Sequence, residues 1–118
     1  MGAAATGPPL FPAGYTAGTI TISAGQANTP LQLLALIQAQ LDPNCPGAGE
    51  EVTIQAESVT LYIGRESKLG GPLSSSNYGY LLTGGSSRTY RSGFPGAHSP
   101  VGDLQVYMAA GTFHVEVT

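Results

Sequence analysis

The clearest alternation of apolar and polar residues lies at the end of the chain, between Asp103 and Thr118. Leucine, valine and methionine alternate with glutamine and tyrosine through residues 104–108, and a second alternating run covers residues 112–118. Side chains on a strand point to opposite faces with a period of two, so each run predicts a strand with one apolar face. The short link Ala109-Ala110-Gly111 predicts an antiparallel hairpin, with Gly111 in a turn conformation and an apolar face that earlier strands must cover.

The same period of two predicts several short strands earlier in the chain, separated by segments rich in glycine, proline and serine. The segment from Ser92 to Gly102 carries two glycines and two prolines inside its ends, and we expect it to be a long loop. Six to eight short strands predict a mainly β fold, an antiparallel β-sandwich of jelly-roll or related topology. The expected strands are 19–23, 51–56, 59–63, 78–83, 88–91 and the two strands of the closing hairpin.

One segment, residues 30–41, has the pattern of a helix instead. Thr29 is placed to act as the N-cap, Pro30 suits the first helical position, and Gln32 completes a capping box. The predicted apolar stripe consists of Leu33, Leu34, Ile37 and Leu41. Leu36 falls outside this stripe and is therefore a candidate for contact with a partner.

Residues 1–17 form an uncharged segment rich in glycine, alanine and proline, which precedes the predicted β-sandwich domain of residues 18–118. Such a segment is ordinarily a disordered terminus. An apolar segment stiffened by proline can instead be held against a neighbouring molecule. We expect an extended N-terminal arm that docks on a partner through four residues: Leu10, Phe11, Pro12 and Tyr15.

Composition favours a protein that binds other protein. Charged residues make up 9% of the chain, against about 25% in an ordinary soluble domain, so much of the surface is poorly hydrated. The net charge of -3 does not favour nucleic acid, although all four basic residues lie between Arg65 and Arg91 and could meet an acidic partner.

Cys45 is the only cysteine, which excludes an intrachain disulfide and a cysteine-based zinc site. The chain has neither a secretory signal pattern nor an apolar run long enough to span a membrane, so we expect synthesis in the cytoplasm.

Catalytic patterns are weak in this sequence. His98, Ser99 and Asp103 could be imagined as a hydrolytic triad, but they share one predicted loop and lack the flanking residues that fix such geometry. The two histidines do not have the spacing of a metal site. We therefore expect no enzyme activity, no metal and no cofactor. Three of the six tyrosines could form a surface that contacts carbohydrate or protein, and these are Tyr78, Tyr80 and Tyr90.

Four motifs together resemble a class of small virion proteins of tailed bacteriophages. They are Glu51-Val-Thr-Ile-Gln-Ala56, Leu61-Tyr-Ile-Gly64, Gly79-Tyr-Leu-Leu82, and Asp103-Leu-Gln-Val-Tyr-Met-Ala-Ala-Gly111 followed by Val115-Glu-Val117. Several proteins of that class are capsid decoration, or cement, proteins with sandwich or jelly-roll folds. The resemblance covers residues 51–118; the predicted helix and the loop of residues 92–102 depart from the pattern, which leaves the position in the virion open.

The resemblance implies a structural protein on the exterior of the capsid that binds the major capsid protein and further copies of itself, as a dimer or trimer. The second set of candidate contact residues comes from the predicted loop and the strand before it: Tyr90, Arg91, Phe94 and Pro95. A tail, neck or head-fibre component of the virion, and a carbohydrate-binding β-sandwich module, are the alternative functions.

Overall fold

Eight strands form two antiparallel sheets of four strands each in the computed structural model, which describes residues 15–45, 51–91 and 100–118. The first sheet has the order β1 (Thr16–Ile22), β8 (Gly111–Val117), β3 (Glu51–Ala56), β6 (Ser87–Arg91). The second sheet has the order β2 (Leu31–Gln32), β7 (Leu104–Met108), β4 (Leu61–Arg65), β5 (Tyr80–Leu82). The helices of the described segments are α1 (Leu33–Gln40), α2 (Glu66–Leu69) and α3 (Pro100–Asp103).

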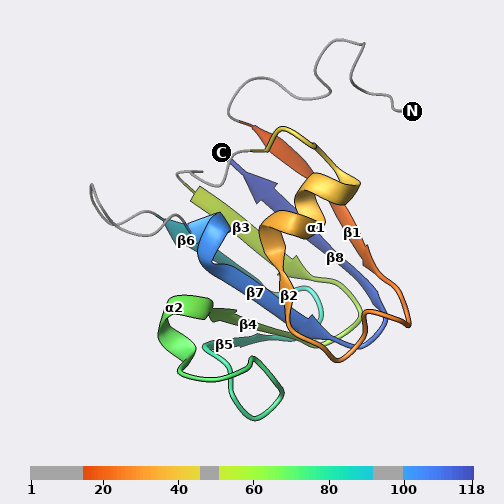
Figure 1. The fold of residues 1–118 in the computed structure, drawn as a ribbon. Helices are drawn as coiled ribbons and strands as arrows, with labels where there is room; N and C mark the ends of the chain where they lie inside the picture. Colours follow the sequence, from red (N-terminus) through yellow and green to blue (C-terminus); the bar gives the residue numbers. More distant parts are fainter. Residues whose placement is uncertain (1–14, 46–50, 92–99) are drawn as a thin grey trace.

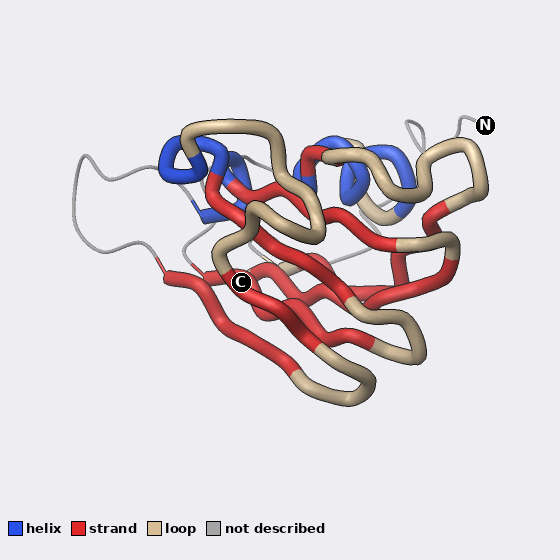
Figure 2. The backbone as a smooth tube through the Cα atoms, turned by 90° about the horizontal axis from the view of Figure 1, so that it is seen from below, coloured by secondary structure: helices blue, strands red, loops and turns tan. Residues whose placement is uncertain are grey.

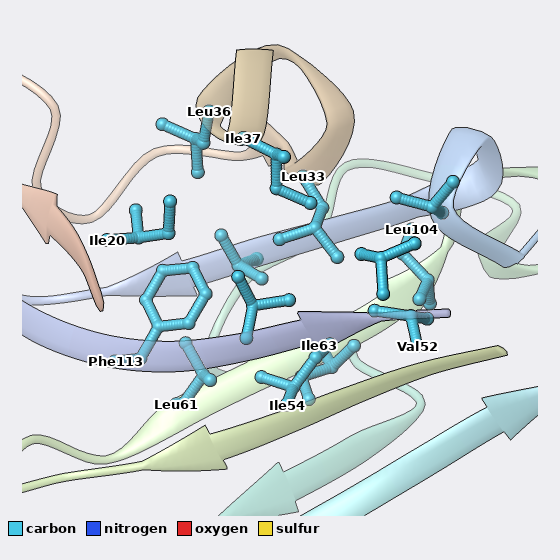
Figure 3. Close-up of a cluster of buried hydrophobic side chains, with 14 of the residues drawn as sticks. Ile20, Leu33, Leu36, Ile37, Val52, Ile54, Leu61, Ile63, Leu104 and Phe113 are labelled. Atoms are coloured by element: carbon cyan, nitrogen blue, oxygen red, sulfur yellow. The ribbon is translucent and has the colours of Figure 1, made fainter. Parts of the chain in front are cut away.

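The apolar faces of the two sheets pack against each other and form one core (Figures 1 and 2). Phe113 of β8 is fully buried and lies between Ile20 of the first sheet and Leu61 of the second (Figure 3). The alternation in the sequence gave the buried residues of most strands, because a period of two places every second side chain on the inner face. This confirms the predicted mainly β fold with two antiparallel sheets.

The predicted C-terminal hairpin is wrong. β7 and β8 do not pair, because Met108 pairs with Leu61 in the second sheet, whereas Phe113 pairs with Ile20 and Ala56 in the first sheet. The link through Ala109 therefore crosses from one sheet to the other. Alternation determines which face of a strand is apolar, but it does not determine which strand lies beside it.

Gly111 does not have the turn conformation that the sequence predicted. This residue is the first of β8 and not part of a turn. A Cβ atom added at Gly111 would lie 2.7 Å from a methyl group of Val59, so the position requires glycine for close packing. The short link can thus pass directly over the end of the core.

The helix starts three residues later than predicted. Leu31 and Gln32 form β2 and pair with Val106 and Gln105 of β7, and α1 begins at Leu33 without a side-chain cap. The Thr29 hydroxyl does not cap the helix but donates to the carbonyl oxygen of Gln26 at 2.8 Å. Pairing with β7 satisfies backbone groups that the predicted capping box would otherwise have satisfied.

Leu36 is a core residue and not a surface residue available to a partner, which corrects the sequence-based expectation. Its side chain is 5% exposed and lies with Leu33 and Ile37 on the face of α1 that points at the core (Figure 3). The helix contacts β1, β2, β7 and α3, so it continues the layer of the second sheet beyond the very short β2 (Figure 1). The apolar arc of α1 is wide, and its buried centre is rotated toward Leu36 relative to the predicted stripe.

Two smaller elements interrupt segments expected to be irregular. α2 follows β4 directly, and α3 ends the predicted loop of residues 92–102, of which residues 92–99 lie outside the described part of the chain. The predicted strand 78–83 is shorter, because β5 begins at Tyr80. Over the described ranges, the structure contains no helix with the length and apolar character needed to cross a membrane.

The burial of Leu36 predicts a large loss of stability on truncation. Leu36→Ala should lower the free energy of unfolding by about 2–5 kcal/mol, the usual cost of a cavity at a buried leucine. Leu34→Ala, on the same helix but only partly buried, is the matched control and should cost clearly less. Urea unfolding of both variants checks this, and equal losses would contradict the assignment of Leu36 to the core.

Candidate functional site

The candidate contact residues do not form one site within the described chain. Leu10, Phe11, Pro12, Phe94 and Pro95 all lie outside the described residues. The other three are Tyr15, Tyr90 and Arg91. Tyr15 precedes β1, whereas Tyr90 and Arg91 belong to β6, the opposite edge strand of the first sheet.

Each of these three side chains has a different environment. The exposed Tyr15 hydroxyl donates to Glu116 at 3.0 Å, and this hydrogen bond is the main reason that the pKa of Tyr15 is raised. Arg91 is exposed, and its Nε atom lies 2.6 Å from Oε2 of Glu51 on the outer face of the first sheet. Tyr90 is buried, so it contributes only a small part of its ring to the surface.

A pocket of about 330 Å³ lies beside Tyr90, at the side of the molecule where β5 and β6 are the edge strands. Both sheets contribute to it, together with α2 and the loop before β5. Three basic and three tyrosine side chains belong to its wall, and none of the described residues that line it carries a carboxylate. The lining residues are Gly64, Arg65, Lys68, Leu69, Asn77, Tyr78, Gly79, Tyr80, Arg88 and Tyr90.

The base of the pocket comes from inward-facing positions of the two edge strands. On β6, Arg88 and Tyr90 pair with the core residues Ile54 and Val52, so both leave the strand on its inner face. On β5, Tyr80 shares the inner face with the buried Leu82. Among the described strands none pairs with the outer edge of β5 or β6, so these side chains lie at the edge of the core between the two sheets.

Arg88 holds the two sheets together at this side. Its guanidinium carbon lies 4.1 Å from the ring centre of Tyr80 in the second sheet and 5.0 Å from that of Tyr90 in the first. The guanidinium group of Arg65, at the end of β4, lies 5.5 Å from the ring centre of Tyr90. We refer to Arg65, Arg88, Tyr80 and Tyr90 as the Arg–Tyr cluster; its geometry is that of cation–π contacts.

α2 forms one wall of the pocket and is fixed from two sides. The Ser67 amide and hydroxyl donate to Asp103 at 2.9 and 2.5 Å, which ties α2 to the last residue of α3, directly before β7. Leu69 lies against Gly64 of β4, where a Cβ atom would come within 2.6 Å of the leucine side chain. The absence of a side chain at Gly64 therefore lets α2 approach the sheet and places Lys68 at the pocket.

The opposite wall is the loop that leads into β5. Asn77 donates from Nδ2 to the Pro72 carbonyl oxygen at 2.9 Å, and the Gly79 amide donates to the Ile63 carbonyl oxygen at 2.8 Å. These bonds hold Tyr78 at the rim, with its ring centre 5.1 Å from that of Tyr62. Tyr62 in turn lies 6.0 Å from Tyr107, so tyrosines extend from the pocket across the outer face of the second sheet.

The electrostatics of the pocket favour an anion. It gathers three of the four basic residues of the chain, and the ion pair that the described residues form is between Arg91 and Glu51, outside the pocket. Burial raises the pKa of Tyr90, while Arg88 and Arg65 act in the opposite direction. The Tyr90 hydroxyl thus keeps its proton at neutral pH and remains a hydrogen-bond donor.

The pocket presents hydrogen-bond donors and the faces of tyrosine rings, and such groups can bind a ligand. Of the groups considered for a hydrolytic triad, Asp103 accepts hydrogen bonds from Ser67, and His98 and Ser99 lie outside the described residues. No group of three or more His, Cys, Asp or Glu side chains among the described residues could hold a metal ion.

Comparisons of the chain with protein-family models, with curated proteins and with solved structures find no match.

Sequence reasoning identified the three tyrosines of the pocket and the clustering of the basic residues, but it did not join them into one site. A signal for the site was present in Ser87–Arg91. Arg88 and Tyr90 are two residues apart, so they lie on the same face of the strand, and they pair with Ile54 and Val52 of β3. A charged residue at an inward-facing position of a strand indicates an edge with an unusual environment.

The left-handed backbone conformation of Gly70, directly after α2, can be tested by substitution. Gly70 has a φ of 73° with no atom within 4 Å of an added Cβ, so Gly70→Ala should cost about 1–2 kcal/mol of stability through backbone strain alone. Gly71→Ala is the matched control, because an added Cβ there makes an ordinary contact of 3.5 Å with Asn77. Thermal unfolding of both variants measures the difference, and equal melting temperatures would contradict the left-handed assignment at Gly70.

Proposed function

We propose that the two sheets form a jelly roll and that the protein is a structural virion protein that decorates and stabilises a bacteriophage capsid. The observation that carries this proposal is the order of the strands. β1 pairs with β8, β2 with β7, β3 with β6, and β4 with β5, all antiparallel. A long hairpin folded over itself into two sheets produces this nesting of pairs, and jelly rolls are frequent in viral capsid proteins.

Fold alone does not establish function, so the proposal also uses the residues that resemble decoration proteins. The motif at residues 51–56 is β3, the motif at residues 61–64 falls in β4, and the last motif spans β7 and the start of β8. The resemblance therefore covers strands from both sheets. The low fraction of charged residues, 9%, also favours a surface that is partly covered by protein.

A decoration protein acts by adding buried area across the joints between capsid subunits. A rigid pair of packed sheets can bridge two subunits, and an apolar arm adds contact area when it binds. In this proposal Leu10, Phe11, Pro12 and Tyr15 contact the major capsid protein or a neighbouring copy. Tyr90, Arg91, Phe94 and Pro95 form a second contact, to which the buried Tyr90 adds only the small part of its ring that reaches the surface. Self-association as a dimer or trimer would strengthen attachment through multivalency.

Copy number on the purified particle tests the proposal. A decoration protein follows the capsid lattice, so quantitative mass spectrometry of particles from the phage that encodes the chain should find hundreds of copies. About six or twelve copies, the number of subunits in a symmetric ring, would instead assign the protein to the neck or tail. Absence of the chain from particles would overturn a structural role in the virion.

A pair of deletions tests the docking of the arm. Removing residues 1–14 leaves β1 intact from Thr16 but removes Leu10, Phe11 and Pro12, and occupancy of the capsid should fall at least tenfold (about 1.4 kcal/mol of binding). Removing residues 1–9 keeps these three side chains and is the control, with occupancy close to that of the full chain. Equal occupancy of both deletions and the full chain would show that the arm makes no contact.

A further inference from the structure

We propose that the pocket beside the Arg–Tyr cluster binds a single acidic sugar, a carboxylate carried on a pyranose ring at the end of an otherwise neutral glycan. The inference concerns a second activity of the same domain. It does not depend on the proposed attachment to a capsid.

The donors of the pocket match a carboxylate. The guanidinium carbon of Arg88 lies 4.1 Å from the ring centre of Tyr80 and 5.0 Å from that of Tyr90, and a guanidinium group carries five N–H donors in a planar fork. A planar fork of this kind matches the two oxygens of a carboxylate better than a lysine does. Arg65 and Lys68 add two further cations to the wall, and neither forms an ion pair with another described residue.

The size of the pocket and its rim match a ring. A volume of about 330 Å³ lies at the lower end of the range for small-molecule sites, about 300–1,000 Å³, and is suited to one sugar unit. Tyr78 and Tyr80 line the pocket and are 42% and 40% exposed, so each presents an apolar ring surface with a polar hydroxyl. A pyranose offers apolar C–H faces to such rings and hydroxyl groups to the polar atoms around them.

The overall charge favours a single anionic unit over a polyanion. The chain carries a net charge of -3, so nucleic acid or a polyuronate would meet repulsion along its length. The three cations of the pocket dominate the electrostatic interaction with a single carboxylate, because more distant charges are screened beyond about 8–10 Å at physiological salt.

An acidic peptide fits the same surface less well. An aspartate or glutamate side chain would supply the carboxylate but no ring to cover Tyr78 and Tyr80. A stable protein interface also requires about 800 Å² from each partner, and the pocket is a concave site of one-residue size.

Edge protection is the alternative explanation for Arg88. Inward-pointing charges on edge strands prevent association with other sheets, and β6 is an edge strand. Under this explanation Arg88 would matter for solubility and would have no effect on a sugar. The two explanations therefore predict different outcomes for the same variants.

Titration of the full chain with small probes, followed by amide chemical shifts in NMR, tests the inference. Methyl β-glucuronide and N-acetylneuraminic acid should each bind saturably, with a Kd of about 1 mM or below, and should shift the amides of residues 64–69 and 77–80. Methyl β-glucoside, which has a neutral hydroxymethyl group in place of the carboxylate, and acetate, which lacks the ring, should each bind at least tenfold more weakly (about 1.4 kcal/mol).

Variants then assign the donors. Arg88→Lys keeps the charge but loses the planar fork, and it should weaken glucuronide binding about tenfold. Lys68→Gln changes an exposed side chain with little risk to folding and should weaken binding severalfold. Thr21→Glu shifts the net charge by the same amount as Lys68→Gln from β1, the far edge of the first sheet, and should leave binding unchanged.

Three results would overturn the inference. Equal affinity for glucuronide and glucoside would exclude recognition of the carboxylate. Equal or tighter binding of N-acetylglutamate amide would favour an acidic peptide as the ligand. Glucuronide binding that is unchanged in Arg88→Lys and Lys68→Gln, together with increased self-association in light scattering of Arg88→Gln, which removes the inward-pointing charge, would leave edge protection as the role of Arg88.

Discussion

The mutual burial of the apolar faces of two sheets is the constraint on which the whole structure depends. Each face is generated by alternation along short strands, and neither sheet is stable in water with that face exposed. Phe113 is fully buried in this core, lies between Ile20 of one layer and Leu61 of the other (Figure 3), and comes from β8, the strand between β1 and β3. The crossings between sheets, including the one that replaced the expected hairpin, follow from the need to supply strands to both layers from one short chain.

Two packed sheets leave open sides, and this chain closes them with different chemistry. Beside β1 and β2, α1 covers the core with Leu33, Leu36 and Ile37, because β2 stops after two residues. Beside β5 and β6, the Arg–Tyr cluster takes this position, with Arg88 between rings from both sheets. A helix gives a dry and complete closure, whereas arginine and tyrosine keep polar atoms at the surface. The pocket therefore exists at the side where the core is closed by polar side chains.

The sequence predicted those features that depend on neighbouring residues. The period of two identified β1, β3 and β4 and the inner positions Ile54 and Val115, because side-chain direction is a local property of a strand. It could not predict strand pairing, since a three-residue link such as Ala109–Gly111 suits a hairpin or a crossing equally well. For the same reason the local sequence predicted Thr29 as a helix N-cap, because the residues near Thr29 do not show that Leu31 pairs with the distant β7. The pocket unites residues from β4, α2, β5 and β6, and only the folded pairing brings them together.

The two faces of β6 place the proposed attachment and the proposed ligand site on different surfaces of the domain. Arg91 lies on the outer face with Glu51, in a row of polar side chains that includes the Thr53–Thr89 hydrogen bond of 2.8 Å. Arg88 lies on the inner face of the same strand and faces the pocket. A protein seated on the outer face of the first sheet would therefore leave the pocket and the tyrosines of the second sheet exposed. Strand alternation, which builds the core, also separates the two surfaces, so the proposed attachment through Arg91 and the proposed site at Arg88 would not compete for the same face of β6.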